Sequence, residues 1–304
     1  MKLVTSVSST FLNDSGVSVV PILGSGSVNR VFIVETADQK IVVRTREGVD
    51  ALNEYKKEAW CIRNADLAGI PTAKVHEVGF CEDAAYMILE FIGGVIGRKS
   101  IFPRSYIWRE LGRLARLVHS IPVAGFGLDL SDLTKGNYQT CWSTYLNYNI
   151  ASLDEDDRLL ELKVLTHRES KIIRTVFEEL QNQSFSFGLN HGDLSLKNVV
   201  VDEHGKVHLL DWGSAEAAIV PHHDLIQLLK MNMLEQDPDS VDIQSFLDGY
   251  EISSGEFQEM LPTLESLLLL RSFHKLRWAI DQRVEGLESY VIHARQSVKR
   301  KLYQ

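Results

Sequence analysis

The chain has 304 residues, of which 44% are hydrophobic and 24% are charged, and its formal net charge is −9. This composition excludes a disordered or collagen-like chain, because the apolar fraction is large enough to bury a core and there are only 20 Gly and 7 Pro. The length fits one large domain or two lobes, and the acidic balance argues against nucleic acid or an anionic membrane as a partner.

The negative charge is concentrated in one part of the chain. Residues 1–100 carry 11 basic and 12 acidic side chains, whereas residues 129–259 carry 9 basic and 24 acidic ones. This acidic stretch is either a solvated helical surface or the wall of a site for a positively charged ligand.

The cysteines and the apolar runs give expectations about location. Cys61, Cys81 and Cys141 are odd in number, are widely spaced and form no CxxC pair, which predicts neither a disulfide framework nor a zinc site. No secretory signal is visible, and the most apolar run, residues 267–270, is far shorter than the roughly 20 residues that span a bilayer. We therefore expect a cytoplasmic protein with no membrane contact and no obligate protein partner.

The first part of the chain, residues 1–92, is predicted to be a small α/β lobe. Polar or glycine-rich turns separate its β-rich runs, and Asp50 is a suitable N-cap for the one helix, which Gly69 and Pro71 would end. The predicted order is three antiparallel strands, a helix and two further strands, over residues 17–23, 28–35, 41–45, 50–67, 73–78 and 85–91.

The remainder, residues 93–304, is predicted to be mainly helical. Apolar residues recur at helical spacing between Ser105 and Ile121. Further helices are expected over residues 139–151, 155–164, 168–182, 223–234, 240–250 and 255–300, the last of them broken. A hairpin formed by residues 198–201 and 206–210 interrupts the helices, so the sequence predicts an α+β protein of two unequal parts.

The most informative motif is HGDLSLKN, residues 191–198, followed after the hairpin by Asp211-Trp212-Gly213. It places an Asp, an amide five residues later and a second Asp beyond a hairpin. Phosphoryl transfer from a nucleotide needs one carboxylate to orient the attacking hydroxyl or accept its proton. It also needs an amide and another carboxylate as oxygen ligands for Mg²⁺. Each residue taken singly also fits an ordinary turn.

At HGDLSLKN and LLDWGSAE the chain resembles the aminoglycoside phosphotransferase and choline kinase family. It also resembles hygromycin B phosphotransferases locally, at Arg44, at Gly125-Phe126-Gly127 and at Cys141-Trp142. The resemblance covers about residues 17–230 and implies a two-lobed protein-kinase-like fold. It implies that Asp193 is the catalytic base or hydroxyl-orienting group, that Asn198 and Asp211 are Mg²⁺ ligands, and that His191 buttresses the loop. The expected nucleotide is ATP or GTP.

In the first lobe, Gly24, Ser25, Gly26 and Ser27 lie between two predicted strands, where kinases place the loop that covers the nucleotide phosphates. Glycines there let the backbone amides approach anionic oxygens. The alternative is a plain β-turn, because the third glycine of the GxGxxG pattern is absent.

The resemblance also assigns nucleotide-binding residues to the third strand, the helix and the end of the fifth strand. Arg44 stands where a protein kinase has its Lys, and it can bridge two phosphate oxygens. Glu58 matches the glutamate with which that residue pairs, and Glu54 is the competing candidate. The carbonyl of Glu90 and the N–H of Ile92 would bind the adenine edge.

Three further residues around the motif receive interpretations. Lys197 is interpreted as a solvated loop residue. His222 and His223 are interpreted as packing around Asp224, which resembles the family's Asp at the start of the helix after the second metal ligand.

Two features favour a small-molecule acceptor over a protein. Only 13 steps separate Asp211 from Asp224, which leaves no room for a long activation segment, and Gly192 stands where protein kinases have an Arg. The acidic stretch, with Asp154, Glu155, Asp157 and Glu235, is predicted to bind a cationic acceptor of the aminoglycoside type. The alternatives are a macrolide, or a metabolite such as choline, a sugar or an amino-acid derivative, and a catalytically inactive kinase-fold binding protein.

Overall fold

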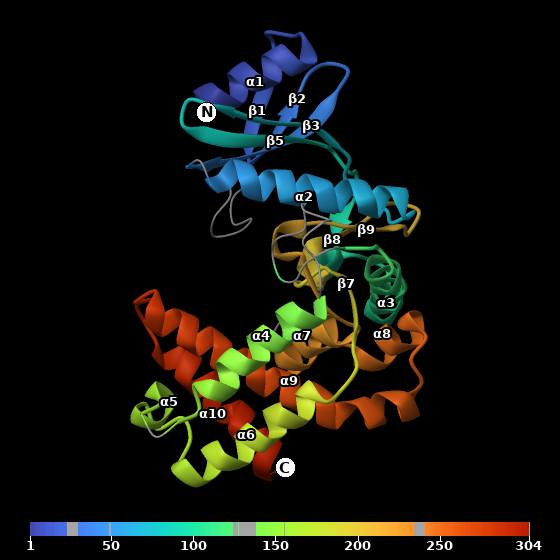
Figure 1. Ribbon diagram of the computed structural model, residues 1–304. Helices are drawn as coiled ribbons and strands as arrows, with labels where there is room; N and C mark the ends of the chain where they lie inside the picture. Colours follow the sequence, from blue (N-terminus) through green and yellow to red (C-terminus); the bar gives the residue numbers. More distant parts are fainter. Residues whose placement is uncertain are drawn as a thin grey trace.

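The structure, a computed structural model, places a five-stranded sheet at one end of the molecule and a group of helices at the other, with short strands between them (Figure 1). It describes residues 1–303 except 23–29, 49, 124–126, 128–137, 155 and 234–240.

The sheet is antiparallel throughout and follows the strand order β1-β2-β3-β5-β4. Its strands are β1 (Ser18–Pro21), β2 (Arg30–Glu35), β3 (Lys40–Glu47), β4 (Val75–Cys81) and β5 (Ala84–Glu90). β-branched and aromatic residues fill the central strands, and alternate side chains face opposite sides of the sheet. The predicted order of three strands, one helix and two strands is therefore confirmed.

A helix packs on each face of this sheet. Helix α1 (Lys2–Leu12) inserts Val4 between Phe32, Val43 and other side chains of one face. Helix α2 (Asp50–Leu67) contacts β4 and β5 on the other face. Because Arg44 adjoins Val43 on β3, its side chain points to the α2 side, where it meets Glu58.

Two short antiparallel sheets carry the segments around the HGDLSLKN motif. Strand β7 (Ser186–Asn190) pairs with β10 (Glu216–Val220), so Asn190 lies opposite Glu216. The hairpin β8 (Val199–Val201) and β9 (Val207–Leu209) pairs with β6 (Val95–Ile96). The motif therefore leaves one sheet at β7 and enters the other at β8.

The remaining elements form the helical part of the molecule (Figure 1). They are α3 (Arg104–His119), α4 (Tyr138–Ala151), α5 (Arg158–Glu161), α6 (His167–Gln181), α7 (His222–Met233), α8 (Ile243–Tyr250), α9 (Ser254–Asp281) and α10 (Glu288–Tyr303). Helices α3 and α8 cross closely at Gly112 and Gly249. A Cβ atom at Gly249 would lie 1.8 Å from the carbonyl oxygen of Arg109, so the crossing requires glycine. No helix in the described part of the chain is long and apolar enough to cross a membrane.

The sequence analysis missed several elements and misplaced one boundary. Helix α1 was not expected, because five of its eleven residues are Ser or Thr and it lacks a side-chain cap. Strands β7 and β10 were also missed, because neither shows a clear alternation of apolar and polar residues. Each is defined by its pairing with the other. The predicted helix over residues 155–164 is wrong in extent, because α5 covers only Arg158–Glu161.

Candidate active site

The loop between β7 and β8 holds three side chains together. The Nδ2 of Asn198 donates to both the backbone carbonyl and the Oδ2 of Asp193, each at 2.8 Å. The Nζ of Lys197 lies 3.1 Å from the same Oδ2. The carboxylate of Asp193 stays partly exposed, so an external hydroxyl could reach it. Lys197 is exposed, as the interpretation of a solvated loop residue requires, and it is also an ion-pair partner of Asp193.

His191 ties this loop to the segment that carries Asp211. Its Nε2 lies 3.0 Å from the carbonyl oxygen of Leu210, and its ring makes an edge contact with Trp212. Burial lowers the pKa of His191, although the charge of Asp224 opposes this effect. A neutral ring with Nε2–H donating to Leu210 satisfies these contacts, so His191 acts as a buttress for the loop.

The fully buried carboxylate of Asp224 anchors the start of the loop. It accepts hydrogen bonds from the backbone N–H of His191 at 3.1 Å and of Gly192 at 2.8 Å. The Nε2 of His119 lies 3.0 Å from its Oδ2, and the Nδ1 of His119 lies 2.8 Å from the hydroxyl of Tyr250. Thus α3, α7 and α8 converge on one carboxylate.

The histidine that bonds Asp224 is therefore His119, which the sequence did not indicate. Of the two histidines predicted to pack around Asp224, His223 pairs with Glu216 at 2.6 Å and His222 makes an edge contact with Phe185. Within the described residues neither side chain of this pair hydrogen-bonds to Asp224, although the charge of His223 helps to lower the pKa of that carboxyl.

Asp211 lies next to the ion pair that spans β3 and α2. Arg44 is hydrogen-bonded to Glu58, and its NH2 lies 3.6 Å from the Oδ1 of Asp211. Burial disfavours the charge of Arg44, but Glu58 and Asp211 overcome this effect and raise its pKa. The competing carboxylate, Glu54, pairs with Arg46 instead.

Lys57 clamps helix α2 onto the Asp211-Trp212-Gly213 segment. Its Nζ donates to the carbonyl oxygens of Gly213 at 2.9 Å and Ala215 at 3.0 Å. Asp211 itself has φ 59° and ψ 69°, a left-handed conformation that Asp tolerates. The clamp therefore places the exposed Asp211 carboxylate beside Arg44. Sequence reasoning missed Lys57, since its partners are backbone atoms more than 150 residues away.

The side chains of Asn198 and Asp211 suit a Mg²⁺ ion in their chemistry. Both hydrogen bonds from the Asn198 amide involve Nδ2, which fixes the orientation of the amide and leaves Oδ1 as the free ligand atom. The Asp211 carboxylate is about half exposed, at 53%, and within the described residues its one ion pair is with Arg44. Mg²⁺ takes oxygen ligands and needs only one or two carboxylates when phosphates and water supply the rest.

The residues predicted to contact the nucleotide base lie where β5 ends. Glu90 pairs with Ile41 of β3, and its side chain accepts a hydrogen bond from the backbone N–H of Lys74 at 3.2 Å. Ile92, two residues after Glu90, packs against the main hydrophobic core. The predicted phosphate loop, Gly24 to Ser27, lies outside the described residues.

Of the four acidic residues predicted for the acceptor, only Asp154 and Asp157 lie in the described part of the chain, and they differ in exposure. Asp157 is buried, and its two carboxylate oxygens receive hydrogen bonds from Arg277 at 2.7 and 3.0 Å. It also caps α5, so it is a structural carboxylate, which corrects the expectation that it binds an acceptor. Asp154 is exposed. Glu155 and Glu235 lie outside the described residues.

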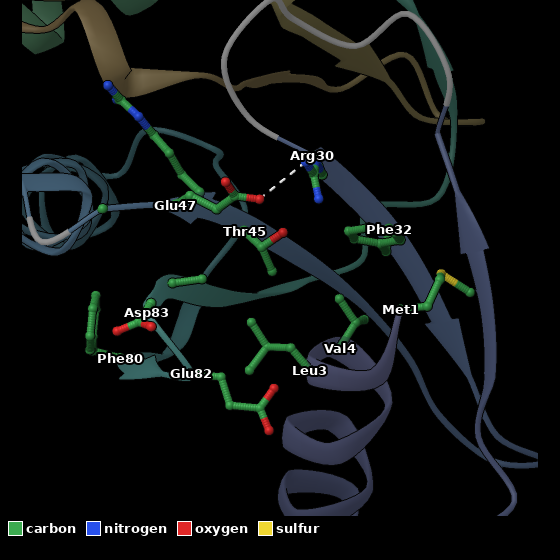
Figure 2. A pocket seen from close by; sticks show the side chains of 13 residues that line it. Met1, Leu3, Val4, Arg30, Phe32, Thr45, Glu47, Phe80, Glu82 and Asp83 are labelled. Carbon is green, nitrogen blue, oxygen red and sulfur yellow. Dashed lines mark ion pairs between the residues drawn. The ribbon is translucent and has the colours of Figure 1, made fainter.

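A hollow of about 900 Å³ opens on the opposite face of the five-stranded sheet from Arg44. Its wall includes Met1 and Val4 of α1, Phe32 of β2 and Thr45 of β3, and Arg30 forms an ion pair with Glu47 at its edge (Figure 2). The sheet separates this hollow from Glu58, which lies on the α2 side. It is therefore not part of the candidate active site.

We expect Gly192→Ala to lower the free energy of unfolding by at least about 2 kcal/mol. Gly192 has φ 77°, and a Cβ atom there would lie 2.4 Å from the carbonyl oxygen of Ser214. Urea unfolding measures the loss. Gly286→Ala is the matched control, because Gly286 has φ 76° with nothing within 4 Å of the added Cβ. Equal losses in the two variants would show that the contact with Ser214 contributes nothing.

A family model and several solved structures match this chain. The model of the phosphotransferase enzyme family APH matches residues 19–263. Among curated proteins, none matches the chain.

Solved structures of similar shape include several phosphotransferases. A thermostable mutant of aminoglycoside phosphotransferase APH(4)-Ia in its apo form has a TM-score of 0.66 and 17% sequence identity, covering 99% of this chain and 100% of that chain. A ternary complex of that enzyme with ADP and hygromycin B has a TM-score of 0.64 and 16% identity, covering 99% of both chains. Spectinomycin phosphotransferase APH(9)-Ia, with ADP and spectinomycin, has a TM-score of 0.54 and 14% identity, covering 95% and 89%. At such identities the likeness shows the fold, which is kinase-like.

Proposed function

Because this chain belongs to the phosphotransferase enzyme family, we propose that it transfers the γ-phosphoryl group of ATP or GTP to a hydroxyl group of a small molecule. The observation that carries the proposal is the partly exposed Asp193 carboxylate, which Asn198 and Lys197 hold in place at the end of β7.

Asp193 orients the acceptor hydroxyl and accepts its proton. A bond forms between the acceptor oxygen and the γ-phosphorus, while the bond from the γ-phosphorus to the bridging oxygen breaks and the nucleoside diphosphate leaves. A carboxylate suits this role, because its negative charge holds the hydroxyl by its hydrogen. The hydrogen bonds from Asn198 restrict the rotation of the carboxylate.

Asn198 and Asp211 would hold Mg²⁺, which neutralises charge on the nucleotide phosphates when bound. The hydrogen bonds of Asn198 to Asp193 hold one ligand, and the clamp of Lys57 on the residues after Asp211 holds the other. The two ligands flank the β8–β9 hairpin at its open end, where the backbone N–H of Leu210 donates to the carbonyl oxygen of Asn198 at 2.8 Å.

The nucleotide lies, in this proposal, between the five-stranded sheet and the catalytic loop. Arg44, held by Glu58, binds phosphate oxygens, and Gly24, Ser25, Gly26 and Ser27 cover them with backbone amides. The Glu90 carbonyl and the Ile92 N–H bind the base. The division of the chain into a nucleotide-binding lobe, residues 1–92, and an acceptor lobe, residues 93–304, belongs to the same proposal.

The segment between the two functional Asp residues favours a small acceptor over a protein. Strand β10 occupies most of the chain between Trp212 and Pro221, and it pairs with β7 over five residues. Helix α7 begins immediately afterwards, at His222. No length remains for a loop that could order a peptide substrate.

The ligands of the neighbouring structures, hygromycin B and spectinomycin, support an aminoglycoside-type antibiotic as one acceptor class to test. Macrolides and metabolites remain the other classes.

The deciding experiment incubates the full chain with Mg²⁺, ATP or GTP and a panel of aminoglycosides, a macrolide, choline, homoserine and sugars. Mass spectrometry then searches for a product with one added phosphoryl group, and chelation of Mg²⁺ is expected to abolish its formation. Tight nucleotide binding with no product from any hydroxyl compound would favour a catalytically inactive binding protein.

A further inference from the structure

Three basic side chains gather on the helical side of the catalytic loop. Arg271 and Lys275 lie four residues apart on α9 and therefore on one face of that helix. Lys230 lies seven residues after His223, on one face of α7, and α7 packs against α9. The NH1 of Arg271 lies 2.9 Å from the Nε2 of His223, which joins the two faces.

The cluster is attached to the catalytic loop through Glu216. This residue opens β10, opposite Asn190, and Asn190 leads directly into the loop that carries Asp193. The Oε1 of Glu216 lies 2.6 Å from His223 and 3.9 Å from the NH2 of Arg271. Burial alone would raise the pKa of Glu216, but His223 and Arg271 hold it at about 2, so this carboxylate stays charged.

The positive charge of the cluster exceeds what Glu216 can neutralise. Lys230 and Lys275 form no ion pair within the part of the chain that the structure describes, whereas Glu216 already pairs with Arg271 and His223. Burial and the charge of Arg271 lower the pKa of Lys230. Burial, Arg271 and Lys230 together lower the pKa of Lys275 to about 8, although Glu216 and, to a smaller extent, Asp193 act in the opposite direction.

This combination is typical of a ligand site. Lys275 is exposed and lies one helical turn from Arg271, so its ammonium group is accessible to a ligand. Among the described residues Glu216 is the one carboxylate that pairs with Arg271 and His223, and an anion that joined these cations would offset their mutual repulsion. Arg271 offers the planar fork that suits carboxylate and phosphate oxygens.

We propose that Lys230, Arg271 and Lys275 bind an anionic group of the acceptor, a carboxylate or a phosphate, while a hydroxyl of the same molecule faces Asp193. The proposal rests on the proposed function and names its substrate class as small hydroxylated acids. A polyamine acceptor would be repelled by these cations, and the buried pair of Asp157 with Arg277 removes one of the carboxylates expected to attract it.

The test compares acceptors that share a hydroxyl skeleton and differ in charge, namely glucose, glucosamine, gluconate and glucose 6-phosphate. The full chain is saturated with Mg²⁺ and AMP-PNP, so that the nucleotide site cannot take up the phosphate, and binding is followed by the shift in Tm. We expect gluconate or glucose 6-phosphate to raise Tm at concentrations where glucose and glucosamine do not, and the two anions distinguish carboxylate from phosphate. Inorganic phosphate is the simplest probe. Absence of binding by all three anions would overturn the proposal.

Variants that each remove one positive charge show where the anion binds. Lys230→Met and Lys275→Met are each expected to weaken binding of the anion about 10- to 100-fold. This factor corresponds to the loss of one charged hydrogen bond. Lys171→Met, which removes an exposed lysine of α6, is the matched control and should leave it unchanged. An increase in nucleotide KM without a change in anion affinity would instead assign these lysines to the nucleotide.

The inference and the proposed function fail in different ways. If the panel of hydroxyl compounds yields a phosphorylated neutral or cationic product and the anions do not bind, the transferase activity stands and the anion site is wrong. If the anions bind at Lys230 and Lys275 but no compound is phosphorylated, the anion site stands and the transferase activity is wrong.

Discussion

We expect Asp193→Asn to lower kcat about 100- to 10,000-fold, the range for loss of a general base. The asparagine amide has nearly the shape of the carboxylate but cannot accept the hydroxyl proton. The Nδ2 of Asn198 keeps its 2.8 Å bond to the backbone carbonyl at position 193, so the loop should hold its conformation. The measurement is acceptor-dependent release of nucleoside diphosphate, with the acceptor identified from the panel.

The control for Asp193→Asn is Asp202→Asn. Asp202 lies in the turn of the adjacent β8–β9 hairpin, where its Oδ1 accepts hydrogen bonds from the backbone N–H groups of His204 and Lys206. This variant should change kcat less than about threefold, because its carboxylate stabilises only the hairpin, through the turn and through His208 of β9 at 3.2 Å. Nucleotide affinity should be similar in both variants. A kcat for Asp193→Asn within threefold of the unsubstituted protein would show that another group accepts the proton.

The contact between Asp193 and Asn198 could be predicted from sequence because the residues of the candidate site are local. Asp193 and Asn198 lie five residues apart, and Asp211 follows after one hairpin, so a single motif places all three. The helices that frame them have clear apolar stripes, as α3 does with Ile107, Leu111 and Leu114. Local spacing and periodicity were sufficient for these features.

The residues that hold the site in place could not be predicted, since their partners are distant in sequence. His119 reaches Asp224 across 105 residues, and Lys57 reaches Gly213 across 156. Lone histidines and helical lysines are common, and only the folded chain selects which of them find a carboxylate or a carbonyl. The sequence pattern does not predict which of these distant residues pair.

The charge around the predicted acceptor site also depends on partners that are distant in sequence. The stretch 129–259 is strongly acidic, which suggested a cationic acceptor. In the fold, Asp157 is neutralised by Arg277 of α9, and Asp242 and Glu256 cap helices. Lys230 is one of the few cations of that stretch, and α9 brings Arg271 beside it. Net charge along the chain therefore does not give the charge that faces a site.

We expect Asp224→Ala to lower the free energy of unfolding by about 3–5 kcal/mol, the cost of removing one partner from a buried charged network. The substitution leaves the N–H groups of His191 and Gly192 without acceptors in a dry interior, and His119 loses its carboxylate. Because the loop that carries Asp193 starts at these two amides, kcat should fall as well. Urea unfolding near neutral pH measures the stability change.

The matched control is Asp242→Ala, which removes a carboxylate that caps α8 at a less buried position and should cost about 1 kcal/mol.

The pH dependence of stability provides a second readout. Burial alone would raise the pKa of Asp224, but the hydrogen bond and charge of His119 hold it well below its ordinary value. A carboxyl with a lowered pKa contributes fully above the unfolded-state pKa of about 3.9, and its contribution is lost as the pH falls below that value. The unsubstituted protein should therefore lose stability more steeply than Asp224→Ala between about pH 5 and pH 3. Parallel pH profiles would show that Asp224 is not the charged anchor of the catalytic loop.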